Sequence, residues 1–123
     1  MDDYPYVNAV SLVGRLSDTP LIKTLPSGDL IMLWRLIVDR PPAERRTPKR
    51  VVDTIDCVTF DNRLFGPARE WRPDQLLEIR GALRRRFWPG GSSCEVVVHR
   101  AEARLSRVAL VGDTAAEVKR APA

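Results

Sequence analysis

The segment GALRRRFWPGG sets three arginines beside two aromatic residues and ends in a Pro-Gly-Gly turn. Side chains two residues apart in a strand point to the same side of a sheet, so Arg84, Arg86 and Trp88 share one side. That side faces away from Leu77 and Ile79, and we expect it to meet solvent. Guanidinium groups contact phosphates and an indole stacks on unpaired bases, so this row predicts a surface for single-stranded nucleic acid.

A second aromatic residue, Phe60, ends the alternating run VVDTIDCVTF. The period of two places it on the side of Thr54 and Asp56, where it would extend the same surface. The competing interpretation is that Trp88 and Phe60 cover a barrel end or a subunit contact, as large aromatics often do in small domains. Taken alone, the residues support both interpretations equally.

The segment RPPAERRTPKR, from Arg40 to Arg50, forms a second basic region. It has three prolines and no apolar periodicity, and it carries five positive charges against one negative. Such a composition is typical of a projecting loop. The loop therefore predicts a basic finger, here called the basic loop, whose cations are available to phosphates.

The overall charge is consistent with a polyanionic partner. The chain has a net charge of +4 at pH 7, and arginine supplies 17 of its 20 basic residues. Positive charge favours phosphate-bearing partners because each neutralised phosphate releases condensed counterions. Net charge alone does not distinguish a surface that binds a polyanion from one that is only solvated. The distribution of the arginines along the chain has to distinguish the two.

The composition is that of one globular domain. The chain has 123 residues, of which 44% are hydrophobic and 29% charged, enough for a single core. The longest nearly uncharged stretch, Leu30 to Val38, is far shorter than the roughly 20 residues that span a bilayer, so we expect no membrane partner. The acidic opening MDDYPYVN lacks the pattern of a secretory signal, which favours the cytoplasm.

Cys57 and Cys94 lie in apolar runs and are expected to be buried thiols.

Alternating apolar residues and turn-forming residues predict an all-β chain. The expected strands are Asn8 to Leu16, Leu30 to Asp39, Val51 to Phe60, Gln75 to Trp88 and Cys94 to Ala103, with a short extended piece at Leu21 to Leu25. A short helix is expected between the third and fourth strands, beginning at Asp61 or Asn62 and ending at Arg69. Closing such a sheet removes its exposed edges, so we predict a five-stranded Greek-key barrel of the oligonucleotide-binding (OB) type.

Further details of the fold follow from the same patterns. Within the fourth strand, one side is expected to carry Leu77, Ile79, Gly81, Leu83, Arg85 and Phe87. Residues 89–92 are expected to turn this strand back into the fifth. The apolar run Leu105 to Val111 is a candidate for an extra C-terminal strand, which would hook a neighbouring subunit. We therefore expect an OB-fold domain over residues 1–112 and a flexible tail over residues 113–123.

The chain offers little for catalysis. His99 is the only histidine, and no cysteine, aspartate or second histidine stands near it at the spacing of a metal site. No nucleophile and base form a recognisable pair. Trp34 and Trp71 are expected to be a core residue and a loop anchor. We predict that the protein is not an enzyme and has no metal or cofactor.

Several segments resemble the bacterial single-stranded DNA-binding protein family (SSB). The resemblance lies in five segments in the family's order and spacing, covering roughly residues 7 to 105: NAVSLVGRLSDTP, LPSGDLIMLWRLIV, IDCVTFDNRLF, LLEIRGALRRRFW and the strand that follows the turn. It implies an OB-fold protein that coats single-stranded DNA without sequence preference and without catalysis, usually as a homotetramer. It also implies a role in DNA replication, recombination or repair at the nucleoid.

The resemblance places Phe60 and Trp88 at the family's base-stacking positions and Arg84 and Arg86 at basic positions beside Trp88. Arg15, which follows the Val-Gly of the first strand, is a weaker candidate. The full set of expected nucleic-acid-binding residues is Phe60, Trp88, Arg84, Arg86, Arg35, Arg45, Arg46, Lys49, Arg50 and Arg15.

The chain also departs from the family pattern. Two further stacking tryptophans of well-known members are replaced here by Pro42 and Thr54, and Asp56 adds a carboxylate that repels phosphates. The turn at residues 89–92 is shorter than the loop that clamps DNA in many members. The chain ends in APA without the family's acidic tip, so we expect no recruitment of repair enzymes through such a tip, whether the chain is truncated or a specialised paralogue. An OB-fold assembly module with weak or no DNA binding, and an RNA-binding module, are the alternative functions.

Overall fold

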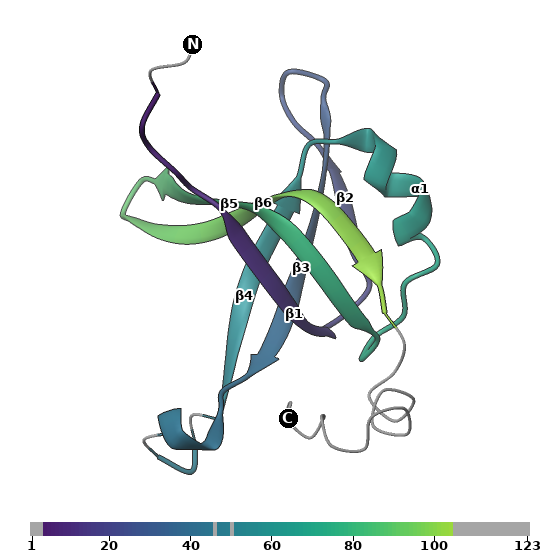
Figure 1. Cartoon of the computed structure of the whole chain (residues 1–123). Helices are drawn as coiled ribbons and strands as arrows, with labels where there is room; N and C mark the ends of the chain where they lie inside the picture. The colour runs from purple at the N-terminus through teal and green to yellow at the C-terminus, as the bar shows by residue number, and fades with distance from the viewer. Residues whose placement is uncertain (1–3, 46, 50, 105–123) are drawn as a thin grey trace.

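A computed structural model describes residues 4–45, 47–49 and 51–104 (Figure 1). The strands in this part of the chain are β1 (Val10–Leu16), β2 (Leu21–Thr24), β3 (Leu30–Asp39), β4 (Val52–Thr59), β5 (Leu76–Trp88) and β6 (Gly91–Ala103). The helical segments are η1 (Pro42–Glu44), η2 (Asn62–Leu64) and α1 (Phe65–Ala68). The predicted strands therefore form within one or two residues of their expected bounds, with one exception: β6 begins three residues early.

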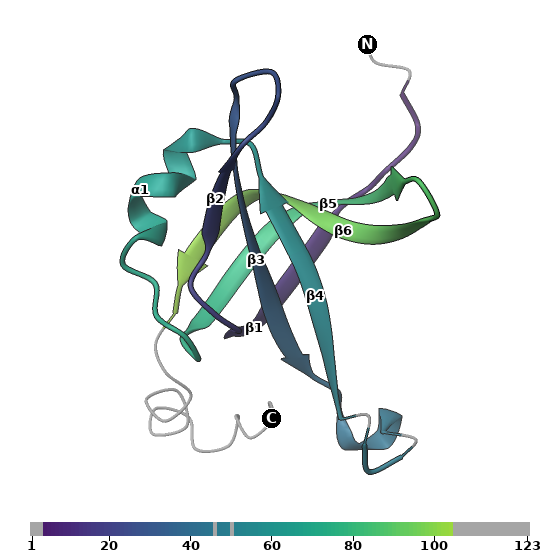
Figure 2. The same cartoon turned by 180° about the vertical axis from the view of Figure 1, so that it is seen from behind.

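Five of the strands close into a barrel, seen from both sides in Figures 1 and 2. Around the barrel the order is β1, β5, β6, β4 and β3, and pairing of Arg15 with Ile37 and of Leu16 with Leu36 joins β3 back to β1. β2 pairs with β3 alone within the described residues. All pairings are antiparallel except that of β4 with β6, which is the Greek-key crossing. The predicted closed OB-type barrel is confirmed.

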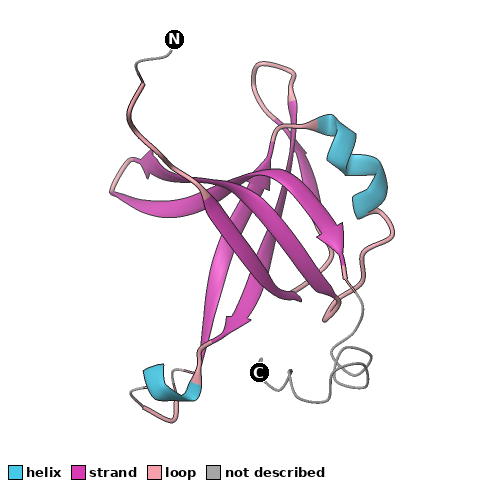
Figure 3. Ribbon diagram, in the orientation of Figure 1, coloured by secondary structure: helices cyan, strands magenta, loops and turns pink. Residues whose placement is uncertain are grey.

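The barrel core consists of the inward side chains of the five strands. Leu16, Leu36, Leu77 and Ile79 are fully buried, and burying one such side chain stabilises the fold by about 1.5–3 kcal/mol. Figure 3 shows the helical segment between β4 and β5 at one end of the barrel. Phe65 and Ala68 of α1 join the same core, as the expected amphipathic helix requires.

Trp34 and Trp71 pack edge to face in this core, with ring centroids 5.4 Å apart and planes at 73°. Offset and edge-to-face arrangements are the favourable ones for aromatic rings, because the positive edge of one meets the negative face of the other. Both side chains are buried. The expected roles of Trp34 in the core and of Trp71 as an anchor for the connection before β5 are confirmed.

A β-bulge changes the register between β5 and β6. Arg80 pairs with Arg100 but the next residue, Gly81, pairs with Val98, so His99 is an extra residue in β6. A side chain at Gly81 would meet the backbone carbonyl of Val97. Glycine therefore permits a close approach of the two strands at the bulge, which also sharpens the local twist.

Beyond the bulge, β5 and β6 continue as a hairpin that leaves the barrel, on the left in Figure 1. The side that Leu83 and Phe87 were expected to share with Leu77 is buried only within the barrel, because Leu83 is 48% and Phe87 74% exposed. Both sides of the hairpin meet solvent there. Trp88 pairs with Gly91, so only residues 89 and 90 connect the two strands, whereas residues 89–92 were expected to form the turn. Gly90 has φ +97°, a conformation that favours glycine.

The hairpin corrects one further expectation. Cys57 is buried, and burial raises the pKa of its thiol to about 12, with smaller contributions from nearby carboxylates. Cys94 was also expected to be buried but is exposed. It pairs with Arg85 in the part of the hairpin that lies outside the barrel, so its apolar neighbours in the sequence do not cover it.

Some expectations fall outside the described residues. These are the extra strand at Leu105 to Val111, the tail over residues 113–123, and the basic-loop residues Arg46 and Arg50; all stay predictions. Within the described part of the chain, no helix is long and apolar enough to cross a membrane.

Candidate nucleic-acid interface

The exposed part of the β5–β6 hairpin carries three of the predicted binding residues. Trp88 is 46% exposed at the end of β5 and is not part of the core. Arg84 and Arg86 precede it on exposed positions of the same strand. Neither guanidinium has a hydrogen-bond or ion-pair partner among the described residues. The hairpin therefore presents an indole and two guanidiniums to solvent, and its one nearby carboxylate, Glu95 opposite Arg84, forms no ion pair with either within the described residues.

Arg85, between them, is engaged differently. Its Nη1 donates a hydrogen bond of 2.8 Å to Ser92 Oγ on β6. This cross-strand bond links the two strands near the turn, where barrel packing no longer supports them. Arg85 thus helps hold the hairpin while its two neighbours stay available.

Phe60 follows β4 directly and is 56% exposed. Its two neighbours are fixed: the buried Thr59 hydroxyl donates to the Val98 carbonyl (2.8 Å) and accepts from the Asp61 amide (3.1 Å). The backbone on both sides of the ring is thus tied to β6. A backbone held in place before binding loses little conformational freedom when a ligand stacks on the ring that it carries.

The Asp61 carboxylate completes this anchor by capping η2, where it accepts from the Arg63 amide at 3.0 Å. The hydrogen bond from the Arg63 side chain is the main cause that lowers the pKa of Asp61, and the hydrogen bond from the Arg63 amide is the second cause. A carboxyl group whose pKa is lowered in the folded state stabilises the fold at pH values above its ordinary pKa. This stabilisation is lost as the pH falls through the lowered pKa. The cap is therefore ionised and intact at neutral pH.

Phe60 lines a hollow of about 450 Å³. Gly28 and Asp29, in the turn between β2 and β3, form one wall of this hollow, and Asn62 also lines it. In Figures 1 and 2 this turn and the tip of the β5–β6 hairpin project in different directions. Phe60 and Trp88 therefore lie at separate places on the barrel, and a strand touching both would have to run across its surface.

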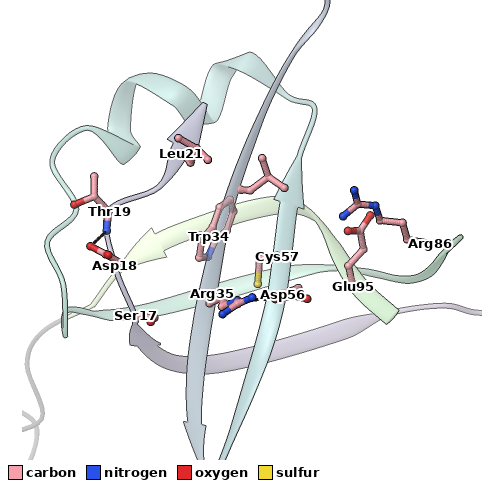
Figure 4. Close-up of a pocket in the computed structure, with 11 residues that line it drawn as sticks. Ser17, Asp18, Thr19, Leu21, Trp34, Arg35, Asp56, Cys57, Arg86 and Glu95 are labelled. Atoms are coloured by element: carbon pink, nitrogen blue, oxygen red, sulfur yellow. Dashed lines mark hydrogen bonds and ion pairs between the residues drawn. The ribbon is translucent and has the colours of Figure 1, made fainter. Parts of the chain in front are cut away.

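Arg35 and Arg86 lie at a second hollow, of about 410 Å³, at the mouth of the barrel; we call it the mouth hollow (Figure 4). Arg35 comes from β3, whereas Arg86 comes from the hairpin. The structure thus brings together two predicted binding residues that are distant in sequence. Arg86 lines the mouth hollow and also lies on the exposed side of the hairpin, so the hollow is continuous with that side.

The charge of Arg35 is partly compensated. Arg35 pairs with Asp56 across β3 and β4, and its Nε donates to Asp56 Oδ1 at 3.0 Å. Both side chains are largely exposed, so solvent screens the pair. The carboxylate nevertheless occupies a guanidinium that a phosphate would otherwise contact.

Comparison with known proteins identifies the family. The profile of the Single-strand binding protein family matches residues 7–111. The chain belongs to this family, as its sequence motifs predicted. SSB-family proteins bind DNA and are not enzymes, which confirms the prediction that the chain lacks catalytic activity.

A solved structure has the same fold as this SSB-family chain. It is described as the Plasmodium falciparum SSB complex with ssDNA, and it is 21% identical in sequence with a TM-score of 0.65. The alignment covers 84% of this chain and 96% of that one. No curated protein sequence matches this chain.

Arg15 has a different environment from the hairpin arginines of this SSB-family chain. It contacts Asp39 at 3.1 Å and Asp74 at 3.7 Å, and it lies where β1 pairs with both β3 and β5. Its charge is balanced by two carboxylates at the end of the barrel opposite the hairpin bulge. The structure does not bring Arg15 to Trp88.

The basic loop projects below the barrel in Figure 1. Within it, Arg45 Nε donates to the Arg40 carbonyl at 2.9 Å, and Arg40 binds Asp53 at 2.7 Å, which lowers the Asp53 pKa. Lys49 is exposed and has no partner within the described residues. The loop thus adds positive charge at a third tip, well apart from the hairpin. Pro42 and Thr54, which replace two family tryptophans, lie in η1 and β4.

Two contributions to this surface were missed by sequence reasoning. Phe87 is 74% exposed beside Trp88, and the Asn8 side chain clamps the hairpin by donating to the Leu83 carbonyl (2.7 Å) and accepting from its amide (2.8 Å). The exposure of Phe87 follows from the length of β5 beyond the bulge. The Asn8 contact spans 75 residues of sequence, and no local pattern indicates it.

Proposed function

We propose that this SSB-family chain binds single-stranded DNA without sequence preference, by stacking bases on Phe60 and Trp88 and by contacting phosphates with Arg84 and Arg86. The observation that carries the proposal is the hairpin itself, on which two guanidiniums without an ion pair in the described residues and an exposed indole leave the barrel together. Cations that track the backbone and rings that stack on bases are the two elements of sequence-tolerant binding to single strands.

The remaining candidates add charge rather than stacking. Arg35 lies at the mouth hollow, and Arg45 and Lys49 add positive charge on the basic loop, a separate tip of the barrel. Together with the expected contributions of Arg46 and Arg50, these charges favour a strand that wraps the barrel. With two family tryptophans replaced, electrostatics carries a larger share of the affinity. We propose a role in DNA replication, recombination or repair, in the cytoplasm at the nucleoid.

The experiment is retention of a labelled oligothymidine by the full chain at two salt concentrations, with duplex DNA as competitor. We expect binding that duplex competes with poorly and that weakens steeply with salt, since each neutralised phosphate of a single strand contributes about −0.7 to the slope of log affinity against log salt. The Arg84→Gln/Arg86→Gln variant should reduce this slope by about 1.4.

The matched control is Arg69→Gln/Arg72→Gln, which removes the same charge from exposed positions between α1 and β5. It should leave the slope nearly unchanged. Absence of retention at low salt would overturn the proposal and favour the alternative of an assembly module, for which the ion pair of Arg35 with Asp56 is the supporting observation.

The carboxylate of Asp56 gives a prediction of opposite sign. Asp56→Asn should strengthen oligothymidine binding by about fivefold at low salt, because a unit charge about 4 Å away contributes roughly 1 kcal/mol in water and Arg35 is released. Fluorescence anisotropy measures the change. Glu70→Gln, an equal charge change at an exposed site near α1, is the control; equal gains in both variants would mean that only net charge matters.

We also propose that the chain forms a homotetramer, as the family resemblance implies. The exposed apolar side chains Leu83 and Phe87 on the hairpin support a contact between copies. Light scattering of the full chain tests the assembly, and a monomeric mass at working concentrations would contradict it.

A further inference from the structure

The mouth hollow contains an unusual buried donor. Trp34 is only 5% exposed, yet its indole Nε1–H has no hydrogen-bond acceptor, and within the described residues it is the one buried side-chain nitrogen or oxygen in that condition. Buried polar groups are almost always paired, so such an exception calls for a specific explanation. Trp34 is also part of the lining of the mouth hollow.

The direction of this donor is fixed. The Trp34 ring packs edge to face on Trp71, so reorientation would disrupt the core. Figure 4 shows the indole extending from β3 into the group of lining residues, with Asp18 and Thr19 on one side and Arg86 and Glu95 on the other. The donor is therefore held ready for an acceptor that enters the hollow.

The lining specifies the chemistry of that acceptor. Besides Trp34, the uncharged part of the lining consists of Leu21, Leu33, the hydroxyls of Ser17 and Thr19, and the Cys57 thiol, whose raised pKa keeps it protonated. The charged side chains of the lining are two guanidiniums, Arg35 and Arg86, and three carboxylates, Asp18, Asp56 and Glu95, so the hollow as a whole carries a net negative charge that disfavours a phosphate. A flat, uncharged group with acceptors on its edge fits these walls.

The rim supplies the complementary contacts. Arg86 and Glu95 lie beside each other at the rim (Figure 4), and neither has a hydrogen-bond or ion-pair partner within the described residues. Arg86 is suited to a phosphate outside the hollow, while the Glu95 carboxylate accepts from an N–H group inside it. The volume of about 410 Å³ lies within the range of about 300–1,000 Å³ found for small-molecule sites.

We propose that the mouth hollow receives one unstacked base of the bound strand, whose edge accepts a hydrogen bond from Trp34 Nε1 while the adjoining phosphate contacts Arg86. This inference rests on the proposed single-stranded DNA binding and adds to it an edge contact inside the barrel mouth. Stacking on Phe60 and Trp88 uses the faces of bases, whereas this contact uses the edge of another base.

The first test follows the indole N–H signals of the ¹⁵N-labelled full chain by NMR during addition of oligothymidine. The chain has three tryptophans, and the Trp34→Phe and Trp88→Phe variants assign their signals. We expect the Trp34 signal to move downfield as a thymine carbonyl accepts its proton. The signal of the buried Trp71 should move little and is the internal reference.

The second test measures oligothymidine affinity of Trp34→Phe, which removes the donor but keeps a ring to pack on Trp71. We expect about a fivefold loss, the usual net effect of one hydrogen bond. The control, Phe65→Leu, alters another buried ring of the core that does not line the hollow, and it should bind as the unmodified chain does. A purely structural role of Trp34 predicts no such difference between the two variants.

The outcomes separate this inference from the proposed function. If oligothymidine binds and shifts the Trp88 signal while the Trp34 signal stays in place, the base-edge contact is refuted and the proposed function stands. If no oligothymidine binds at all, the proposed function itself fails. Should Trp34→Phe not fold, the NMR measurement on the unmodified chain decides alone.

Discussion

Replacing Phe60 and Trp88 together with alanine should weaken oligothymidine binding by about 30-fold or more, because one base stack on an aromatic ring is worth about 1–3 kcal/mol in OB-fold single-strand binders as a class. Both rings are about half exposed, so their removal leaves no cavity in the core and the barrel should unfold at nearly the same temperature. Anisotropy of a labelled oligothymidine is the suitable measurement, since the substitution removes an intrinsic fluorophore.

The matched control removes two other exposed aromatic rings, Tyr4 and Tyr6, which pack on each other at the start of the described chain. Their replacement by alanine should change the affinity by less than about threefold, because neither stands at a predicted stacking position. Equal losses in the two double variants would contradict the assignment of Phe60 and Trp88 and would indicate that exposed aromatics act without regard to position.

The second large effect concerns the fold that carries the hairpin. Gly81→Ala should destabilise the protein by about 3 kcal/mol or more, at the upper end of the effects of overpacking. The added methyl group would meet the backbone carbonyl of Val97 at the bulge, and a backbone atom of the barrel wall has no room to move aside. Urea denaturation followed by circular dichroism gives the free energy of unfolding.

Gly66→Ala is the control for this prediction. Gly66 lies in α1, and a methyl group there would meet no atom within 4 Å. Alanine is favoured over glycine in a helix by up to about 1 kcal/mol, so this variant should be as stable as the unmodified chain or slightly more stable. Equal stability of the two alanine variants would show that the strands separate at the bulge without loss.

The sequence was sufficient to predict the barrel because each strand is defined locally. The alternation in β4 and β5 and the turn residues at Pro26–Asp29 and Pro89–Gly90 fix where strands begin and end. The short helix was predictable for the same reason, since Asp61 caps it and Phe65 and Ala68 form its apolar stripe. These features depend on residues close together in the chain.

The site was less predictable because it depends on where strands meet. The period of two assigns Leu83 and Phe87 to the side of Leu77, but only the bulge and the length of β5 beyond it determine that this side leaves the core. Likewise, the pairing of Arg35 with Asp56 follows from the register of β3 on β4. The unpaired Trp34 donor depends on the packing of several strands, and no pattern in one strand indicates it.

Arg15 and Arg86 illustrate the same limit. Both are arginines on alternating strands, and the sequence gives no reason to separate them. In the fold, Arg15 forms ion pairs with two carboxylates, whereas Arg86, although Glu95 lies near it, has no ion pair within the described residues. Long-range contacts therefore determine which cations are left for phosphates.

The most direct measurement is photo-cross-linking of the full chain to an oligothymidine that contains 5-iodouracil, followed by mass spectrometry of tryptic peptides. Cross-linking requires a base in contact with a side chain, so it tests stacking itself rather than affinity. We predict adducts on Trp88, in the peptide of residues 87–100, and on Phe60, in the peptide of residues 51–63. Adducts confined to other peptides, with these two unmodified at saturating DNA, would contradict the proposed interface.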